Sequence, residues 1–179
     1  IIYTSLVSGE LELWSMNPDG SGKQQLTNRL GYDGGAFYSY DASKIVWRAY
    51  YPETEKEIAD YKSLLVENSI RPMALQIWTM NANGTNKKQI TDNNSANFGP
   101  IYFPKADKII FSSNMHDPKG RDFDLYSINI DGTDLERITY FEGFDGFPMF
   151  SPNGQYLVFS SNRNQNKRGD TNIFICEWK

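Results

Sequence analysis

The stretch Leu13-Trp14-Ser15-Met16-Asn17-Pro18-Asp19-Gly20 decides the fold, because the chain repeats it. It returns as Ile77-Trp78-Thr79-Met80-Asn81-Ala82-Asn83-Gly84 and as Leu125-Tyr126-Ser127-Ile128-Asn129-Ile130-Asp131-Gly132. Each copy is followed by a Leu-Thr or Ile-Thr pair, at residues 26–27, 90–91 and 138–139, and a truncated fourth copy begins at Ile173. Repetition at this spacing is typical of a stack of equivalent supersecondary units.

Two further blocks recur between these copies. One is Asp33-Gly34-Gly35, Asn97-Phe98-Gly99 and Asp145-Gly146-Phe147 with the residues that follow, and the other is the set of apolar runs at 1–5, 45–49, 109–113 and 157–161. Each block is short, rich in β-branched and aromatic residues and bounded by turn formers, which predicts strands. The Asp-Gly and Asn-Gly pairs predict tight hairpins in which both central residues adopt positive φ.

The spacing of the blocks indicates the architecture. Ile109 and Leu157 are 48 positions apart, and so are Leu125 and Ile173. Four strands repeating every ~40 to 50 residues predict an all-β fold, a β-propeller of four-stranded antiparallel blades. We expect one propeller domain over residues 1–179, with blades at about 1–28 (partial), 33–91, 97–139 and 145–179 (partial). These are about three and a half to four blades, either a small ring with two imperfect blades or, as we favour, part of a larger ring.

One blade is longer than the others because it carries an insertion. Ile58, Tyr61, Leu64 and Leu65 recur at helical spacing, and Thr54 with Glu57 forms a capping-box pattern. The sequence therefore predicts a helix at about residues 53–68, lying on a rim of the propeller.

Composition excludes several kinds of function. The net charge is −4 with both signs interspersed, which argues against nucleic acid as a partner because such binding needs a basic face. No run approaches the ~18 apolar residues of a membrane span, so we expect no membrane insertion. The single cysteine, Cys176, excludes an internal disulfide and a multi-cysteine metal site, and we predict no metal and no cofactor. The chain starts inside a strand-like run without a Met, so we expect the natural N-terminus to lie upstream.

The strongest candidate site comes from the repeat itself. Asp33, Asn97 and Asp145 occupy equivalent positions at the start of the innermost strand, so symmetry would place them around the mouth of the central channel. A ring of carboxylates and an amide could hold a cation, water or a basic peptide segment. The alternative is that each side chain caps the backbone of a neighbouring turn.

A second candidate is the loop around His116, the only histidine of the chain. His116 next to Asp117 could suggest a catalytic base, yet no Gly-x-Ser-x-Gly nucleophile motif is present. We therefore expect no catalytic residues, and we assign His116, Asp117 and Arg121 to a binding loop, since loops often carry recognition.

The blocks resemble the TolB-type propeller repeat, in which a third strand ends in Met-Asn-x-Asp-Gly and a Phe-Ser-Pro-Asp-Gly turn follows. The matching residues are 14–27, 78–91 and 126–139, together with Phe150-Ser151-Pro152-Asn153-Gly154. The resemblance covers essentially the whole chain. It implies the C-terminal portion of a six-bladed ring.

The resemblance also implies a function. It points to a periplasmic or secreted, non-catalytic module of the bacterial cell envelope that binds a protein or peptide. The alternative is the accessory, substrate-screening propeller of a secreted peptidase whose catalytic domain lies outside this chain. Because an incomplete ring exposes sheet edges, a homodimer formed through these edges is a further expectation.

Overall fold

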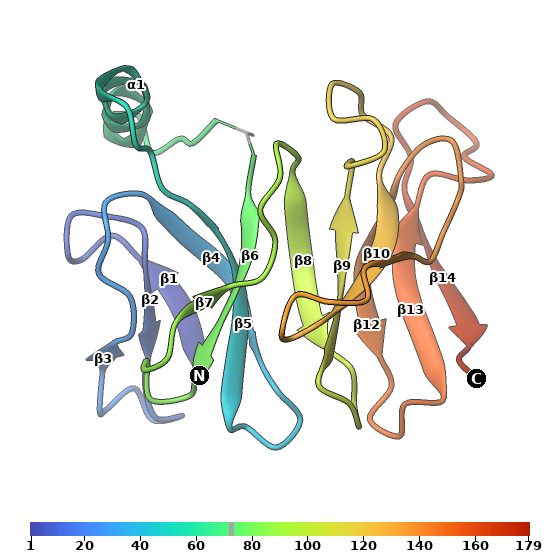
Figure 1. Cartoon of the computed structure of the whole chain (residues 1–179), viewed down its shortest axis with the longest axis horizontal. Helices are drawn as coiled ribbons and strands as arrows, with labels where there is room; N and C mark the ends of the chain where they lie inside the picture. Colours follow the sequence, from blue (N-terminus) through green and yellow to red (C-terminus); the bar gives the residue numbers. More distant parts are fainter. Residues whose placement is uncertain (72–73) are drawn as a thin grey trace.

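The repeated blocks form four antiparallel sheets, which confirms the predicted class of a partial β-propeller (Figure 1). The computed structural model describes residues 1–71 and 74–179. The first sheet contains β1 (Ile2–Ser5), β2 (Glu12–Ser15) and β3 (Gln24–Gln25). The second contains β4 (Tyr32–Tyr38), β5 (Lys44–Tyr50), β6 (Gln76–Asn81) and β7 (Lys88–Gln89). The third contains β8 (Asn97–Tyr102), β9 (Lys108–Ser113), β10 (Asp124–Asn129) and β11 (Glu136–Arg137). The fourth contains β12 (Asp145–Phe150), β13 (Tyr156–Ser161) and β14 (Asn172–Glu177).

The threonine that closes each repeat has a structural role. Its side-chain oxygen accepts a hydrogen bond from a backbone N–H of β2, β6 or β10, the strand next to the outermost strand of the same blade. The outermost strand is too short to pair with that N–H. The three bonds are Leu13 N to Thr27 at 2.8 Å, Ile77 N to Thr91 at 2.8 Å and Leu125 N to Thr139 at 2.9 Å. Because a buried N–H without a partner is costly, this bond explains why the repeat ends in threonine.

The hairpin turns differ from the predicted type. Gly20, Gly84 and Gly132 have positive φ, but the Asp or Asn before each of them does not. Each glycine N–H donates to the carbonyl of the asparagine three residues earlier, as in Gly20 N to Asn17 O at 2.9 Å. The expectation of two positive-φ residues was therefore wrong, because the turn is a four-residue β-turn followed by a left-handed glycine.

The inserted helix is present as predicted. Helix α1 (Glu55–Val66) begins at Thr54, whose side chain accepts from the N–H of Glu57 while the Glu57 carboxylate accepts from the N–H of Thr54. Its one buried side chain, Tyr61, donates a hydrogen bond to the carbonyl of Gly31 and so fixes the helix beside the first two blades. No helix of the described residues is long and apolar enough to cross a membrane.

The hydrophobic core lies between neighbouring blades rather than inside each sheet. One cluster joins Leu13 of the first blade to Trp47 of the second, another joins Ile77 to Phe111, and a third joins Ile110 to Phe159. Trp47 and Phe111 are completely buried. Burying one large apolar side chain contributes roughly 1.5–3 kcal/mol, so the contacts between blades dominate the stability of the fold.

The same backbone bond connects each pair of neighbouring blades. The donor is the N–H of the polar residue at or next to the start of β4, β8 or β12. The acceptor is the carbonyl that precedes β2, β6 or β10 in the blade before it. The bonds are Asp33 N to Leu11 O at 2.8 Å, Asn97 N to Leu75 O at 3.1 Å and Asp145 N to Phe123 O at 2.7 Å. We call these places the first, second and third junctions.

Candidate functional site

The long connections of the chain gather at one end of the molecule, the upper end in Figure 1. This end carries the segment with α1 between β5 and β6, the loop of residues 114–123 and the loop of residues 162–171. The opposite end carries the tight hairpins. Since binding residues concentrate on loops held by a rigid scaffold, the upper end is where a site is expected.

Four phenylalanines meet at this end of the third junction. Phe98 lies on β8, Phe147 lies on β12, and Phe123 and Phe144 directly precede β10 and β12. The ring centroids of Phe98 are 5.2 Å from those of both Phe123 and Phe147, and those of Phe144 and Phe147 are 6.1 Å apart. We call these four residues the phenylalanine patch. Phe147 is exposed and the other three are half-buried, so part of this apolar cluster reaches the surface.

Phe147 has a backbone conformation that is unusual for its residue type. Its φ is 54°, and its counterparts in the second and third blades are glycines, Gly35 with φ 61° and Gly99 with φ 60°. A side chain in this left-handed region costs about 1–2 kcal/mol relative to glycine. The ring of Phe147 is nevertheless 55% exposed. Residues strained in this way occur more often at functional sites than elsewhere.

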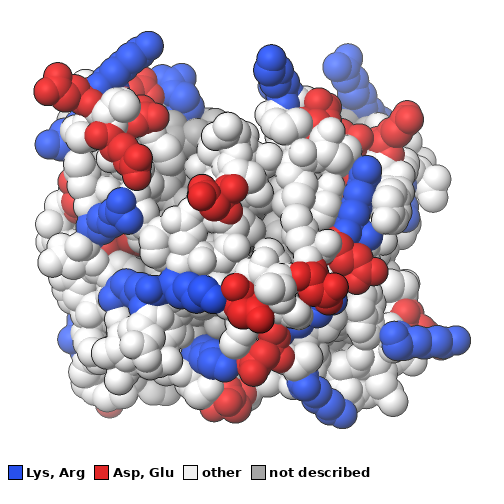
Figure 2. Space-filling view, in the orientation of Figure 1, with Lys and Arg blue, Asp and Glu red and all other residues white. Residues whose placement is uncertain are grey.

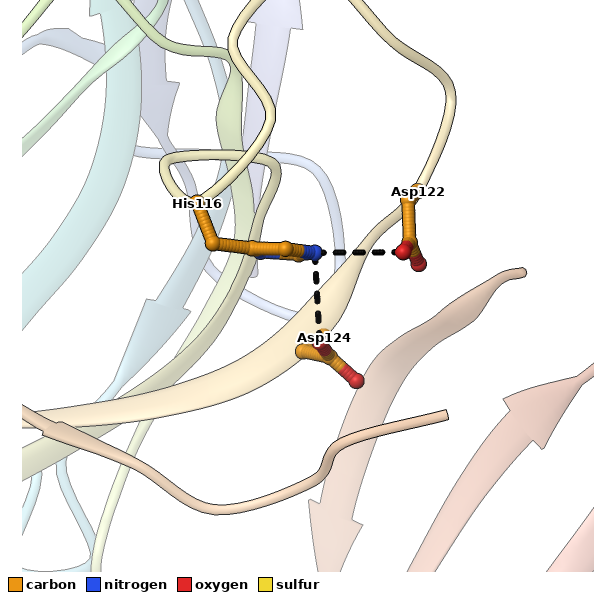
Figure 3. A group of neighbouring side chains, drawn as sticks. All are labelled: His116, Asp122 and Asp124. Carbon is orange, nitrogen blue, oxygen red and sulfur yellow. Dashed lines mark ion pairs between the residues drawn. The ribbon is translucent and has the colours of Figure 1, made fainter. Parts of the chain in front are cut away.

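His116 belongs to a polar network with Asp122 and Asp124 (Figure 3). Its Nε2 lies 3.3 Å from Asp122 Oδ2 and 3.5 Å from Asp124 Oδ2, and its Nδ1 lies 3.0 Å from the hydroxyl of Tyr126. Burial raises the pKa of Tyr126, which keeps that hydroxyl protonated. The network ties the loop of residues 114–123 to the start of β10.

The imidazole and the two carboxylates could also hold a metal ion, because their donor atoms lie within 4.8 Å of one another. However, Asp124 Oδ2 already accepts hydrogen bonds from Nε and Nη2 of Arg137, the former at 2.9 Å. A metal ion at this place would compete with the guanidinium for the same oxygen. The arrangement is that of an ion-pair network that anchors the loop.

The other two residues predicted in this loop do not join the network. Asp117 closes a turn with its backbone, since its N–H donates to Asn114 O at 2.8 Å and its carbonyl accepts from Gly120 N at 2.9 Å. The side chains of Asp117 and Arg121 are exposed. Their role in binding stays a prediction.

The predicted channel residues Asp33, Asn97 and Asp145 occupy equivalent places, but their side chains are completely buried. No hydrogen bond joins any two of the three among the described residues. Their side-chain oxygens accept hydrogen bonds from their own blades: Asp33 from Trp47 and Tyr51, Asn97 from Ser113, and Asp145 from Arg163. Asp33 Oδ2 and Asp145 Oδ1 have no hydrogen-bond partner among the described residues, but they too are buried. A binding role for the three residues stays a prediction.

Two adjoining cavities of about 330 and 470 Å³ open at the first junction. They share Arg29, Tyr51 and Trp78. The Arg29 guanidinium stacks on the Tyr51 ring at 4.1 Å, and the edge of that ring packs on Trp78 with centroids 5.3 Å apart. The aromatic side chains of this groove support one another, whereas the phenylalanine patch exposes a strained ring.

Comparison with known proteins places this geometry among solved folds. A TolB-type protein of Agrobacterium tumefaciens superposes with a TM-score of 0.71 at 21% identity, over 98% of this chain and 56% of the other. The fold is that of a TolB-like β-propeller. TolB of Acinetobacter baumannii gives a TM-score of 0.69 at 14% identity, over 98% of this chain and 37% of the other.

Less similar propellers include an enzyme. A puromycin-hydrolyzing peptidase of Mycobacterium tuberculosis gives a TM-score of 0.64 at 9% identity, over 93% of this chain and 25% of the other. A scan of protein-family models and a search of curated proteins returned no match. The chain thus spans little more than half the length of the TolB-type protein of Agrobacterium, and at these identities the likeness concerns the fold alone.

Proposed function

We propose that this TolB-like propeller is a non-catalytic binding module of the bacterial cell envelope, and that it docks a protein or peptide on the phenylalanine patch. The observation that carries the proposal is Phe147, a 55% exposed ring held in a conformation that glycine adopts in the two preceding blades. An apolar side chain of the partner would cover this ring. Such exposed aromatic groups commonly anchor protein interfaces.

The surroundings of the only histidine support a role without catalysis. The ring nitrogens of His116 face Tyr126, Asp122 and Asp124, and within the described residues no serine or cysteine lies within hydrogen-bond distance of them. The common Ser–His and Cys–His forms of nucleophilic catalysis require such a pair. The face in Figure 2 shows lysine and arginine interspersed with aspartate and glutamate, which favours a protein partner over nucleic acid. Likeness to TolB supports a periplasmic or secreted location.

The proposal is tested by capture of partners with three forms of the chain. The wild type, Phe147→Gly and Phe37→Ala are immobilised and exposed to a bacterial envelope extract, and the bound proteins are quantified by mass spectrometry. Phe37 is the matched control, because it is 40% exposed on the inner strand of the second blade and lies outside the patch. We expect at least one protein to bind the wild type and Phe37→Ala but not Phe147→Gly. Equal capture by all three forms would contradict docking on the patch.

A second candidate function has support from one comparison. Likeness to the puromycin-hydrolyzing peptidase favours an accessory propeller that screens substrates for a catalytic domain outside this chain. The open reading frame around the coding sequence tests this candidate, since it requires a hydrolase domain in the same frame.

A homodimer remains a proposal for the edge of the fourth blade. Ile173 and Ile175 of β14 are 72% and 67% exposed, which suits a strand that pairs with another copy. Light scattering of the 179-residue chain distinguishes a monomer from a dimer.

A further inference from the structure

The first junction buries two carboxylates. Glu12 is 1% exposed at the start of β2, and Asp33 is completely buried on β4. The backbones that carry them are joined by the bond from Asp33 N to Leu11 O at 2.8 Å. Two buried acidic side chains therefore lie at one junction, and the charge of Glu12 acts on Asp33.

Each carboxylate has one oxygen that is satisfied and one that is not. Asp33 Oδ1 accepts from Trp47 Nε1 and from the Tyr51 hydroxyl, both at 2.6 Å, and Glu12 Oε1 accepts from Arg29 N at 2.7 Å. Asp33 Oδ2 and Glu12 Oε2 are buried and have no hydrogen-bond partner among the described residues. Buried polar atoms of this kind normally find a partner, because leaving one unpaired costs about 1–3 kcal/mol.

The other two junctions surround their polar side chains differently, although Asp145 Oδ1 of the third junction also has no hydrogen-bond partner among the described residues. The second junction has amides in the equivalent positions, and Asn97 Nδ2 donates to Gln76 Oε1 at 3.4 Å. The third junction keeps two carboxylates but gives each an arginine, Arg137 for Asp124 and Arg163 for Asp145. The first junction alone has two carboxylates and no guanidinium paired with either of them in the described part of the chain.

The remaining groups around the pair do not neutralise it. Arg29 gives Glu12 its backbone N–H, while its guanidinium stacks on the Tyr51 ring at 4.1 Å. Burial and the charge of Asp33 raise the pKa of Tyr51, so its hydroxyl remains a neutral donor. Tyr61 of α1 donates to a backbone carbonyl, and the nearby Glu10 would add a further negative charge.

Two buried like charges without a counter-charge are expensive, and a proton is the smallest group that relieves them. We propose that Asp33 holds a proton near neutral pH in this buried acidic site, and that its loss loosens the junction between the first and second blades. Burial, assisted by the charge of Glu12, raises the pKa of Asp33 to about 7 against the hydrogen bonds from Tyr51 and Trp47. The other two junctions are built differently, since the second has amides in these positions and the third places an arginine against each carboxylate.

The Trp47 indole reports the titration directly, because its N–H donates to Asp33. In the ¹⁵N-labelled 179-residue chain, this indole signal is assigned with Trp47→Phe and followed from about pH 5 to about pH 9, which brackets the titration of the pair. We expect one step with a midpoint near 7, no step in Asp33→Asn, and a lower midpoint in Glu12→Gln. Either of two results overturns the proposal that Asp33 holds a proton under the influence of Glu12. One is an indole signal that stays fixed across this range, and the other is a midpoint that Glu12→Gln leaves unchanged.

Amide exchange tests the loosening and carries its own control. The Asp33 N–H bonds across the first junction, and the Asp145 N–H makes the same bond across the third. Above the midpoint, we expect the protection factor of the Asp33 amide to fall about tenfold, as for a 1.4 kcal/mol loss, while that of Asp145 holds. Equal behaviour of the two amides overturns the proposed loosening. Neither result depends on docking at the phenylalanine patch, so the two proposals are tested independently.

Discussion

The first and third junctions have the same backbone frame but neutralise their buried acidic side chains differently. At the third junction, Asp145 lies against Arg163, whose guanidinium also stacks on Phe159 at 5.2 Å. At the first junction, Glu12 and Asp33 have no arginine paired with them among the described residues. The repeat thus provides the same backbone arrangement at both junctions. Single side chains decide whether the buried acidic group lies against an arginine, as Asp145 does, or carries a proton, as we propose for Asp33.

The phenylalanine patch lies at the third junction, where the buried carboxylates are paired with arginines. A strained residue such as Phe147 persists only where the surrounding structure fixes it. The third junction supplies that support through the ion pair of Arg163 with Asp145 and the ring contacts of Phe147 with Phe98 and Phe144. We therefore expect the stiffest junction to carry the docking surface.

The largest expected effect is the pH dependence of stability caused by Asp33. Its pKa is about 7 in the fold against an ordinary aspartate value of 3.8, so the folded chain binds more protons than the unfolded chain between these values. This stabilisation is complete below about pH 4 and is lost as the pH rises through about 7. At about 1.4 kcal/mol per pKa unit, the loss is at most about 4 kcal/mol.

Urea unfolding of the wild type and Asp33→Asn at several pH values measures this loss, because the difference between them removes the contribution of all other groups. Asp33→Asn should be the more stable of the two above about pH 8 and should lose this advantage as the pH falls. The same pH slope in both forms would contradict the assignment.

The next largest effect concerns the third junction. Arg163→Met removes the counter-charge of the completely buried Asp145 and should lower the free energy of unfolding by about 3 kcal/mol at neutral pH. Arg168→Met is the control, since Arg168 is an exposed residue of the same loop, and it should change stability by less than about 0.5 kcal/mol. Equal unfolding midpoints for the two variants would show that the ion pair does not hold the junction.

The repeat and the capping box allowed the blades and helix α1 to be predicted from sequence, because both depend on local patterns of turn formers, apolar residues and caps. The network of His116 was predicted only in part. The loop reverses direction after His116 and returns Asp122 and Asp124 to it, which no spacing rule reveals. Phe147 was missed, although the aligned blocks show it where other copies have glycine, because the positive φ of that position is visible only in the structure.

A smaller effect is expected at α1, which packs beside the first junction. Thr54→Ala removes the capping box and should cost about 1 kcal/mol, seen as a roughly fivefold loss of amide protection in the helix. Ser63→Ala, at an exposed position within the same helix, should change protection much less. If both variants exchange alike, the cap does not determine the stability of α1.

The smallest effect on stability is expected at the docking surface. Phe147→Gly relieves backbone strain but loses ring contacts of similar size, so the free energy of unfolding should change by less than about 1 kcal/mol. Gly35→Ala, at the equivalent position of the second blade, introduces strain without ring contacts and should destabilise by about 1 kcal/mol. Thermal unfolding of both variants compares them, and a clear loss of stability in Phe147→Gly would make Phe147 a structural residue.

Site-specific crosslinking tests the central claim most directly. A photoreactive phenylalanine analogue is placed at position 147 or, as the control, at position 37, and each protein is irradiated in bacterial envelope extract. We predict a discrete covalent adduct with a partner protein when the analogue is at position 147, and no adduct when it is at position 37. An adduct from position 37 with none from position 147 would contradict docking on the phenylalanine patch.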